Sequence, residues 1–236
     1  MINLLASLIA GTAVWAFQRS ARFRRLAHKR EFFGIHSGVR CTVSVSRHAA
    51  SNLSDSVHRR DLAATVELAT IIKECGGEID LIISTGDRRG VGTIPEFCIG
   101  GPHGNKRTEA HLKRFVPGFR INTFEEDPEG LTIFVGNEEF RRTRGQEEFV
   151  LLIRVALPGE SMAPLWIICG QIAQSNYAAA RYLVSHYESL MRKYGAKRSF
   201  CLAFRLLDSQ AYGPNQLEAV GDLTKLAFSK PTARGA

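Results

Sequence analysis

The chain has 236 residues, of which 44% are hydrophobic and 23% are charged, so it can bury a core as one domain with appendages. Its formal net charge is +8, but the basic excess is concentrated between residues 18 and 31, where six basic residues accompany a single acid. The remaining 25 basic and 22 acidic residues leave only +3 for the rest of the chain. This mild excess argues against a general DNA- or RNA-binding groove.

An apolar run at residues 2–17 precedes the basic segment. As a helix it would reach about 24 Å, slightly less than the roughly 30 Å hydrocarbon core of a bilayer. A cleaved signal peptide carries its basic residues before the apolar stretch, and an amphipathic surface helix needs a polar face; the sequence shows neither. A buried helix would leave the following cations unexplained, whereas the positive-inside rule accounts for them.

We therefore predict a single-pass protein of the cytoplasmic membrane, with the membrane as a partner through residues 2–17. The expected organisation is a transmembrane anchor at 1–18, a basic juxtamembrane segment at 19–38, a cytoplasmic α/β domain at 39–228 and a disordered tail at 229–236.

The soluble part alternates expected strands with expected helices. A strand at residues 41–45 leads to a helix in which Leu62, Val66, Ala69 and Ile72 recur at helical spacing before Gly76 and Gly77 end it. Further expected elements are an apolar strand of the buried parallel type at 79–84, a strand at 94–99, a helix containing Leu112, Phe115 and Val116, a strand at 164–170, a long helix containing Ala179, Leu183, Leu190 and Tyr194, and a strand at 199–207.

Two features of the pattern define the predicted fold. The short connection between the strands at 79–84 and 94–99 indicates that these two strands are not neighbours. The segments at 119–124, 131–136 and 147–157 have turns and no helix between them, which predicts an antiparallel meander. The predicted fold is therefore a three-layer, Rossmann-like α/β domain with a mostly parallel sheet and an antiparallel meander insertion, preceded by one amino-terminal transmembrane helix.

The loop at residues 100–107 is the first candidate binding site, because ligands settle at the carboxyl ends of parallel strands. Gly100, Gly101 and Gly104 allow the backbone to approach a bound group, and Asn105 stands where the next helix begins. Lys106 and Arg107 place cations in the first helical turn, against the helix dipole, which is reasonable if an anion is bound there. The candidate ligand-binding residues are Gly100, Gly101, Gly104, Asn105, Lys106 and Arg107.

A second loop has the same layout, with a glycine at a strand end and an asparagine where a helix begins. Its candidate residues are Gly170, Gln171, Ser175 and Asn176, as the opposite wall of the site. Simple helix capping is the alternative explanation for both asparagines. Neither loop has the Walker A or the GxGxxG spacing, so the sequence supports no standard nucleotide fingerprint and names no cofactor.

Catalytic residues are less clearly indicated. Asp87 and Glu96 are the main candidates for an acid or base beside a bound nucleotide, and Asp61, His103 and Glu109 could also reach the site. Each has a structural alternative, such as an ion pair or a turn. No nucleophile elbow or Ser-His-Asp arrangement is present, and neither the histidines nor the five widely spaced cysteines show metal-ligand spacing, so no metal site is predicted.

The phrases "EFCIGGPHGNKRTEAHL" and "CGQIAQSNYAAARYL", with "HRRDLAATVELATIIKECGG" upstream, resemble a family of bacterial proteins to which no activity is attached. The resemblance spans most of residues 41–207, and family members often have a similar short hydrophobic amino terminus. It implies that the two loops form one shared site and assigns no catalytic residue.

Three hypotheses of function follow. The first is a domain that binds a small anionic ligand such as a nucleotide and acts as a sensor or regulatory module. The second is an enzyme that hydrolyses or transfers part of a nucleotide. The third is an interaction scaffold that binds a protein partner through the basic loop at residues 140–144, with Arg141 and Arg142.

Overall fold

The computed structural model describes residues 2–53, 55–83, 91–123, 125–127, 131–159 and 162–230, with side chains described at residue 12 and from residue 14 onward. The elements in chain order are α1 (Ile2–Phe33), β1 (Arg40–Val45), α2 (Arg59–Glu74), β2 (Glu78–Ile83), β3 (Glu96–Ile99), α3 (Lys106–Phe115), β4 (Phe119–Ile121), β5 (Ile133–Val135), β6 (Glu138–Phe140), β7 (Glu147–Val155), β8 (Leu165–Gly170), α4 (Ala173–Tyr194), β9 (Phe200–Leu207), α5 (Ser209–Tyr212), β10 (Leu217–Asp222) and α6 (Thr224–Phe228).

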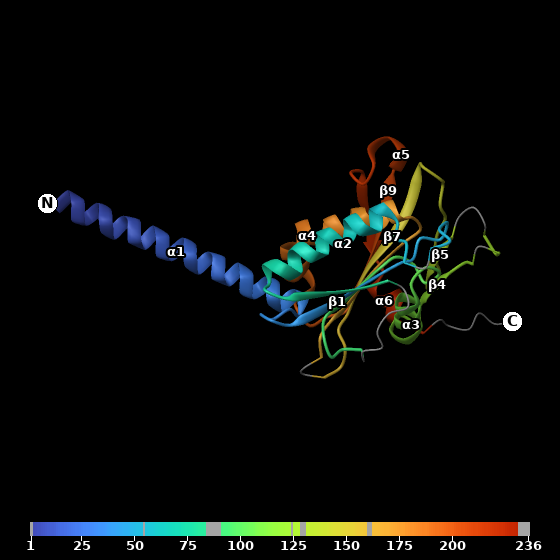
Figure 1. The fold of residues 1–236 in the computed structure, drawn as a ribbon, viewed down its shortest axis with the longest axis horizontal. Helices are drawn as coiled ribbons and strands as arrows, with labels where there is room; N and C mark the ends of the chain where they lie inside the picture. Colours follow the sequence, from blue (N-terminus) through green and yellow to red (C-terminus); the bar gives the residue numbers. More distant parts are fainter. Residues whose placement is uncertain are drawn as a thin grey trace.

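The fold is α/β (Figure 1). Its main sheet has seven strands in the order β10-β9-β7-β8-β3-β1-β2. Strands β2, β1, β3 and β8 pair in parallel, whereas β7, β9 and β10 join by antiparallel pairing. The sheet is therefore mixed, and the prediction of a mostly parallel, Rossmann-like sheet is wrong. Strand β1 lies between β2 and β3, as the short connection between those two strands predicts.

Strand β7 accounts for much of that error. The sequence pattern assigns residues 147–157 to an antiparallel meander inserted in the domain, but β7 lies inside the main sheet between β8 and β9. All of its residues after Glu147 are buried, which requires cover on both faces of the strand. Only β4, β5 and β6 form a separate small antiparallel sheet.

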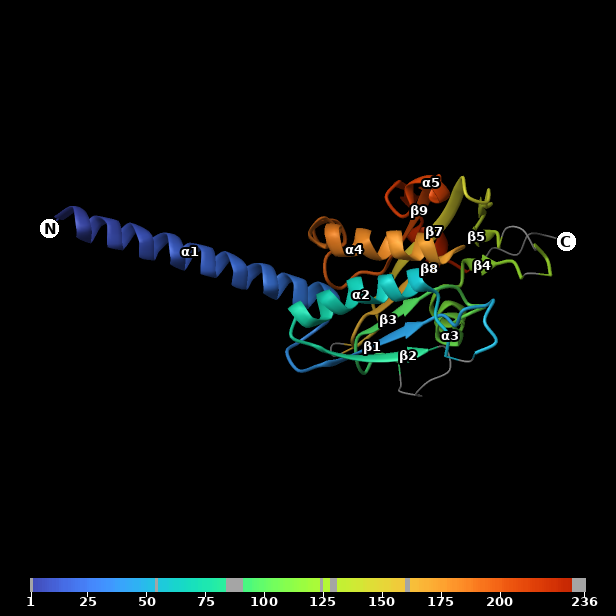
Figure 2. The same cartoon turned by 45° about the horizontal axis from the view of Figure 1, so that its top comes forward.

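The main sheet separates two hydrophobic cores. Helices α2 and α4 lie side by side (Figure 2). One core joins the sheet to α2, α4 and the end of α1, where Phe32 and Phe33 are fully buried beside Trp166. The other core joins the opposite face to α3, α6 and the small sheet. The body of the domain thus begins before residue 39, within the last turn of α1.

Helix α2 presents a different face to the core from the one the sequence suggests. Leu62 and Val66 are 51% and 58% exposed, whereas Leu68 and Ile72 are buried. The carboxyl of Asp61 is also buried on this inward face. A polar residue facing inward displaces the apolar stripe from the position that hydrophobic spacing alone predicts.

Strand β2 is an edge strand. Its residues are exposed or half-buried, and Leu81 is 49% exposed. The apolar composition of residues 79–83 predicts burial between helices, but the strand has only β1 as a neighbour. Position in the sheet therefore decides its exposure.

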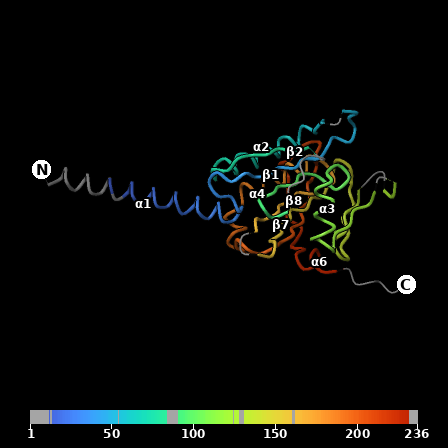
Figure 3. Tube along the Cα trace, turned by 60° about the horizontal axis from the view of Figure 1, so that its bottom comes forward, coloured from blue at the N-terminus to red at the C-terminus, as the bar shows by residue number. Residues whose placement is uncertain are grey.

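Helix α1 extends away from the body of the domain as a long arm (Figures 1 and 3). No helix among the described residues is long and apolar enough to cross a membrane. The predictions of a transmembrane helix at 1–18 and of a single-pass protein of the cytoplasmic membrane are therefore wrong. The apolar run ends at Phe17 and a basic stretch begins at Arg19, which leaves the run about 6 Å short of a span.

Candidate functional site

A cleft of about 940 Å³ opens at the carboxyl ends of β1, β3 and β8. Both loops that the sequence singles out line it, together with the segment after β1 and the start of α2. Of the predicted ligand-binding residues, those on the cleft wall are Gly100, Gly101, Gly104, Lys106, Gly170, Gln171 and Asn176, while Asn105, Arg107 and Ser175 lie behind it. The topology thus brings two loops that are 70 residues apart in sequence to one site.

The three glycines of the first loop differ in whether the structure leaves space for a side chain. Gly100 has a φ of +96°, and a Cβ there would lie 1.9 Å from Ser46 Oγ, so only glycine fits. A Cβ at Gly104 would come within 3.1 Å of the Arg47 carbonyl oxygen. A Cβ at Gly101 would meet nothing closer than 3.9 Å, and its φ is not positive. The fold therefore requires Gly100 but does not require Gly101.

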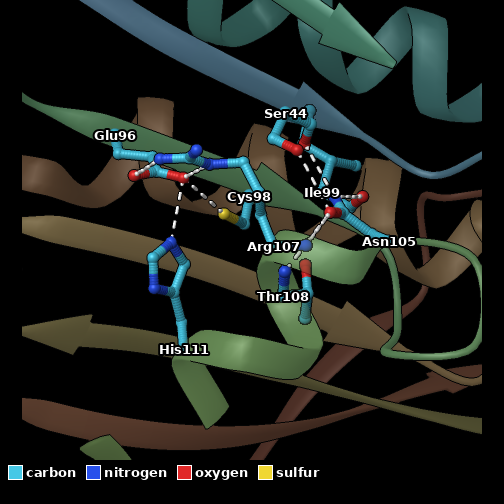
Figure 4. A network of polar contacts seen from close by, with 8 residues as sticks. All are labelled: Ser44, Glu96, Cys98, Ile99, Asn105, Arg107, Thr108 and His111. Atoms are coloured by element: carbon cyan, nitrogen blue, oxygen red, sulfur yellow. Dashed lines mark hydrogen bonds and ion pairs between the residues drawn. The ribbon is translucent and has the colours of Figure 1, made fainter. Parts of the chain in front are cut away.

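Asn105 holds the start of α3 against the sheet. Its Oδ1 accepts hydrogen bonds from the backbone N–H groups of Arg107 and Thr108, and its Nδ2 donates to the carbonyl oxygens of Ser44 and Ile99 (Figure 4). Asn105 is fully buried. These contacts make it a structural cap that aligns the loop with β1 and β3, as the capping explanation of the sequence pattern proposes.

Arg107 forms an ion pair with a carboxylate of the protein itself. Its Nε and Nη2 donate to the two carboxylate oxygens of Glu96 at 2.5 and 2.7 Å, and His111 Nε2 lies 2.9 Å from Glu96 Oε1 (Figure 4). Burial raises the pKa of Glu96, but the hydrogen bonds from Arg107 and His111 outweigh burial and lower this pKa to about 2. Glu96 stands at the start of β3, at the far end of the strand from the cleft.

Glu96, Cys98 and His111 are the one group of three potential metal ligands within the described ranges, with ligand atoms within 4.8 Å of one another. The Arg107 guanidinium already occupies both oxygens of Glu96, and its charge opposes a cation there. Burial raises the pKa of the Cys98 thiol well above its usual value, which disfavours the thiolate. We interpret the cluster as a structural network under α3.

The second wall of the cleft depends on Asn176. Its Oδ1 accepts a hydrogen bond from the Gly170 N–H at 2.7 Å, and its Nδ2 donates to Asp61 Oδ1 at 2.9 Å. The contact links the start of α4 to the start of α2. A Cβ at Gly170 would lie 2.4 Å from Ser175 Oγ, so this glycine is required for packing. Gln171 also has structural partners, because its side chain bonds to Phe149, Leu131 and Phe140.

Asp61 is the carboxyl group of the cleft. It is 5% exposed, and burial raises its pKa to about 6, against the opposing effects of the Asn176 hydrogen bond and of His48. His48 and His58 stack with ring centroids 5.3 Å apart on the same wall. Burial, together with nearby positive charge on His48, Arg59 and Arg60, lowers the pKa of His58. His58 Nδ1 accepts the Arg60 N–H, so this imidazole also caps α2.

Sequence reasoning missed these two histidines and gave Asp61 only a minor place. The available signal was position, since His48 follows the first strand and His58 directly precedes a helix that begins at the cleft. Carboxyl-end loops of parallel strands are the expected place for site residues.

Ser46 has a buried hydroxyl group on the cleft wall. The residue is 8% exposed, and Ser46 Oγ has no hydrogen-bond partner in the described part of the chain. Buried polar atoms are nearly always paired, so an unpaired hydroxyl between two glycines of a cleft is a feature that requires an explanation.

The cleft wall carries more positive than negative charge. Arg47 and Lys106 line it with three histidines, against Asp61 as the lining carboxylate of the described residues. Lys106 Nζ pairs with Glu109 at 2.9 Å, but the lysine side chain is 67% exposed, so this surface pair is weak. The local field favours an anion.

The remaining sequence candidates are in different places. Asp87 falls outside the described residues. His103 lines the cleft and its Nε2 lies 3.0 Å from the Asn122 carbonyl oxygen, while Glu109 is bound between Lys106 and Lys113. In the loop at 140–144, Arg141 is exposed beside Glu139, and the Arg142 side chain is 17% exposed near Glu148.

Comparison with protein families, with curated proteins and with solved structures gives no match to this chain. The geometry and charge of the cleft are therefore the observations that bear on function.

Proposed function

We propose that this protein binds a small anionic ligand in the cleft at the carboxyl ends of β1, β3 and β8 and acts as a sensor or regulatory module. The observation that carries the proposal is the glycine at position 101. Neither backbone conformation nor packing requires a glycine there, and the position lies on the cleft wall. Close approach of a ligand to the backbone explains it.

Two further features support an anionic group at this point. The unpaired Ser46 hydroxyl lies beside the glycine loop and can donate to a ligand oxygen. Arg47 and Lys106 supply positive charge at the same wall, and α3 directs the start of its dipole toward the loop. A phosphate group can interact with the hydroxyl group, with the two cations and with the start of the helix.

The size and polarity of the cleft favour a nucleotide over an inorganic ion. About 940 Å³ lies in the upper part of the range for small-molecule sites. Asp61 and Asn176 lie on the opposite wall, where they can bind hydroxyl or amine groups of a larger ligand. Inorganic phosphate would leave this wall without a partner.

The test is a thermal-shift screen of the full chain against mononucleotides, cyclic nucleotides, sugar phosphates and inorganic phosphate. A ligand at one hundred times its Kd adds about 2.7 kcal/mol of stability. We expect a shift with at least one phosphate ester, its loss in Gly101→Ala, and its retention in Lys113→Ala, which changes an exposed residue of α3 outside the cleft wall. A screen without any shift would refute the proposal.

A second candidate function is an enzyme that hydrolyses or transfers part of a nucleotide, and one observation favours it. Asp61 is a buried carboxyl on the cleft wall with a pKa of about 6, close to the pH at which general acid–base catalysis works best. Its position supports Asp61 in this role, because Glu96 is held by Arg107 away from the cleft.

The two functions are separated by Asp61→Asn. In an enzyme, this variant loses turnover of a bound nucleotide by about 100-fold or more while it still binds the nucleotide. In a sensor, wild-type protein incubated with the same nucleotide releases no product, and chromatography of the mixture distinguishes the two cases.

A further inference from the structure

A second pocket, of about 610 Å³, lies at the opposite end of the sheet from the cleft. It opens at the amino ends of the parallel strands, next to the residues that precede β1, β3 and β8, which are Val39, Pro95 and Pro164. The end of α1 contributes Glu31, and Gly34 directly follows this helix. The pocket shares no lining residue with the cleft, so it is a separate site.

Arg154 on β7 forms part of the pocket wall and is 2% exposed. Its Nη1 donates to the Arg198 carbonyl oxygen at 3.0 Å and its Nη2 donates to the Ala196 carbonyl oxygen. The guanidinium lies 5.5 Å from the Phe32 ring centroid and 5.4 Å from that of Trp166. Within the described ranges it forms no ion pair with a carboxylate.

An arginine buried to this extent is almost always paired with an anion. The carbonyl oxygens and the two rings offset part of the cost of burying this charge, but they do not neutralise it. Burial lowers the pKa of the guanidinium to about 10, so it is still charged at neutral pH.

Two nitrogen donors at this place have no hydrogen-bond acceptor in the described part of the chain. Arg154 Nε and Trp166 Nε1 are both buried without a partner among the described residues. The two residues are directly opposite each other in the β7–β8 pairing, so their side chains lie on the same face of the sheet. Arg154 is the one of the two that lines the pocket, and an unpaired Nε on a guanidinium without a carboxylate partner indicates a missing group that carries negatively charged oxygen atoms.

The other lining residues indicate what the rest of the missing group is like. His36 and Lys197 add cationic or polarisable groups, and Glu31 is the lining acid of the described residues. More than half of the lining residues are apolar, namely Val39, Pro95, Ala156, Leu157, Met162, Ala163, Pro164 and Ala196. A phosphate ion would leave this apolar surface uncovered, whereas an apolar chain would cover it.

We propose that this pocket is a second ligand site, which binds a small organic carboxylate with an apolar body, the carboxylate pairing with Arg154. The assignment is independent of the function proposed for the cleft. It uses the chemistry by which an arginine pairs with a carboxylate through two hydrogen bonds.

Trp166 provides a local probe for the test. The chain has two tryptophans, and Trp15 is 59% exposed on the α1 arm. In full-length Trp15→Phe protein, emission therefore reports on Trp166 beside Arg154. We would titrate this protein with sodium octanoate, with octanol as the uncharged analogue and with inorganic phosphate as the anion without an apolar body.

We expect octanoate to change Trp166 emission saturably, with a Kd at least about tenfold below that of octanol, and phosphate to have no effect. Arg154→Met, which keeps an apolar side chain of similar length, should weaken octanoate binding at least about tenfold. The cleft variant Gly101→Ala should leave octanoate binding unchanged, which separates the two sites.

The proposal is overturned if octanoate gives no saturable change, if octanol binds equally well, or if Arg154→Met binds octanoate as tightly as wild type. Should circular dichroism show that Arg154→Met does not fold, two exposed lining residues decide instead. Lys197→Ala should weaken octanoate binding by about two- to threefold and Glu31→Gln should strengthen it by a similar factor, since both act through the field at the carboxylate. Equal affinities in these variants would overturn the proposal.

Discussion

Neighbouring glycines in the first cleft loop have opposite roles. Gly100 adopts a left-handed backbone conformation and leaves no space for a side chain beside Ser46, whereas a Cβ at Gly101 would meet no atom closer than 3.9 Å. The first glycine is a requirement of folding, and we propose that the second lets a ligand approach the backbone. A sequence pattern of glycines does not distinguish these roles, because it contains neither φ nor the distance to a neighbour.

The stability of two alanine variants should separate the roles. We expect Gly100→Ala to lower the free energy of unfolding by about 2 kcal/mol or more, through backbone strain and overlap with Ser46 Oγ. Gly101→Ala should change it by less than about 0.5 kcal/mol. Urea denaturation of both variants measures the difference, and equal losses would contradict the assignment.

The Arg107–Glu96 pair shows what the sequence could not supply. Cations at the start of a helix suggest a bound anion, but the anion that Arg107 meets is Glu96, which is 11 residues earlier on the other side of a loop. Such pairing depends on the relative placement of β3 and α3. The sequence therefore indicated a negative charge near Arg107, while the fold was needed to identify that charge as Glu96.

The buried Glu96 predicts a specific acid sensitivity. Its pKa falls from 4.5 to about 2 on folding, so the unfolded state binds the proton more tightly. The stabilisation is therefore complete above about pH 4.5 and is lost as the pH falls toward 2; it amounts to about 3 kcal/mol. Denaturation curves between pH 2 and pH 6 should show a steeper loss in wild type than in Glu96→Gln. Parallel pH profiles would contradict this account.

At the scale of elements, the sequence predicted secondary structure better than pairing. Residues 41–45, 164–170 and 199–207 are strands as expected, because β-branched and aromatic runs bounded by turns give a local signal. The position of β7 has no such signal, since strand order depends on contacts between distant segments. The edge position of β2 and the inward face of α2 were missed for the same reason.

Helix α1 has an exposed part and a buried part. Thr12 and the residues from Val14 to Arg25 are exposed, while Phe32 and Phe33 are fully buried against the sheet. The arm should therefore be dispensable for folding, and the last turn should not.

Truncation tests this division. Removal of residues 2–24 should shift Tm by less than about 2 °C, because that part of the helix makes no buried contact through its described side chains. Phe32→Ala should lower stability by about 3–5 kcal/mol through the cavity that it leaves beside Trp166. Calorimetry of the truncated chain and of Phe32→Ala measures both effects, and a large loss on truncation would show that the arm is part of the folding unit.

At the scale of the whole molecule, one sheet carries two separate pockets at its two ends. The cleft uses the carboxyl ends of the parallel strands and the starts of three helices, while the Arg154 pocket uses the amino ends and the base of α1. Only the first arrangement could be predicted from the sequence, since the carboxyl-end rule applies to it. The second depends on β7, whose position no local pattern indicated.

The protonation state of Asp61 should make anion binding in the cleft depend on pH. An acid whose pKa is raised on folding favours the native state when protonated, so this contribution to stability is lost as the pH rises from about 4 through 6. An anion bound at the same wall is repelled by the Asp61 carboxylate, so it binds more tightly when Asp61 is protonated and neutral. We expect anion affinity to rise as the pH falls from 7 to 5, with a smaller rise in Asp61→Asn, as calorimetric titration at three pH values will show.

The most direct test of the cleft assignment is a pair of measurements on Ser46→Ala with AMP as the probe. If the Ser46 hydroxyl group forms a hydrogen bond only when a ligand is bound, its removal should leave the free energy of unfolding of the unliganded protein unchanged or slightly higher. The reason is that the variant no longer buries an unpaired polar group. The same change should weaken AMP binding by about tenfold in calorimetric titration. Unchanged AMP affinity in Ser46→Ala, or the absence of any AMP binding to wild type, would contradict the account of the cleft as an anion site.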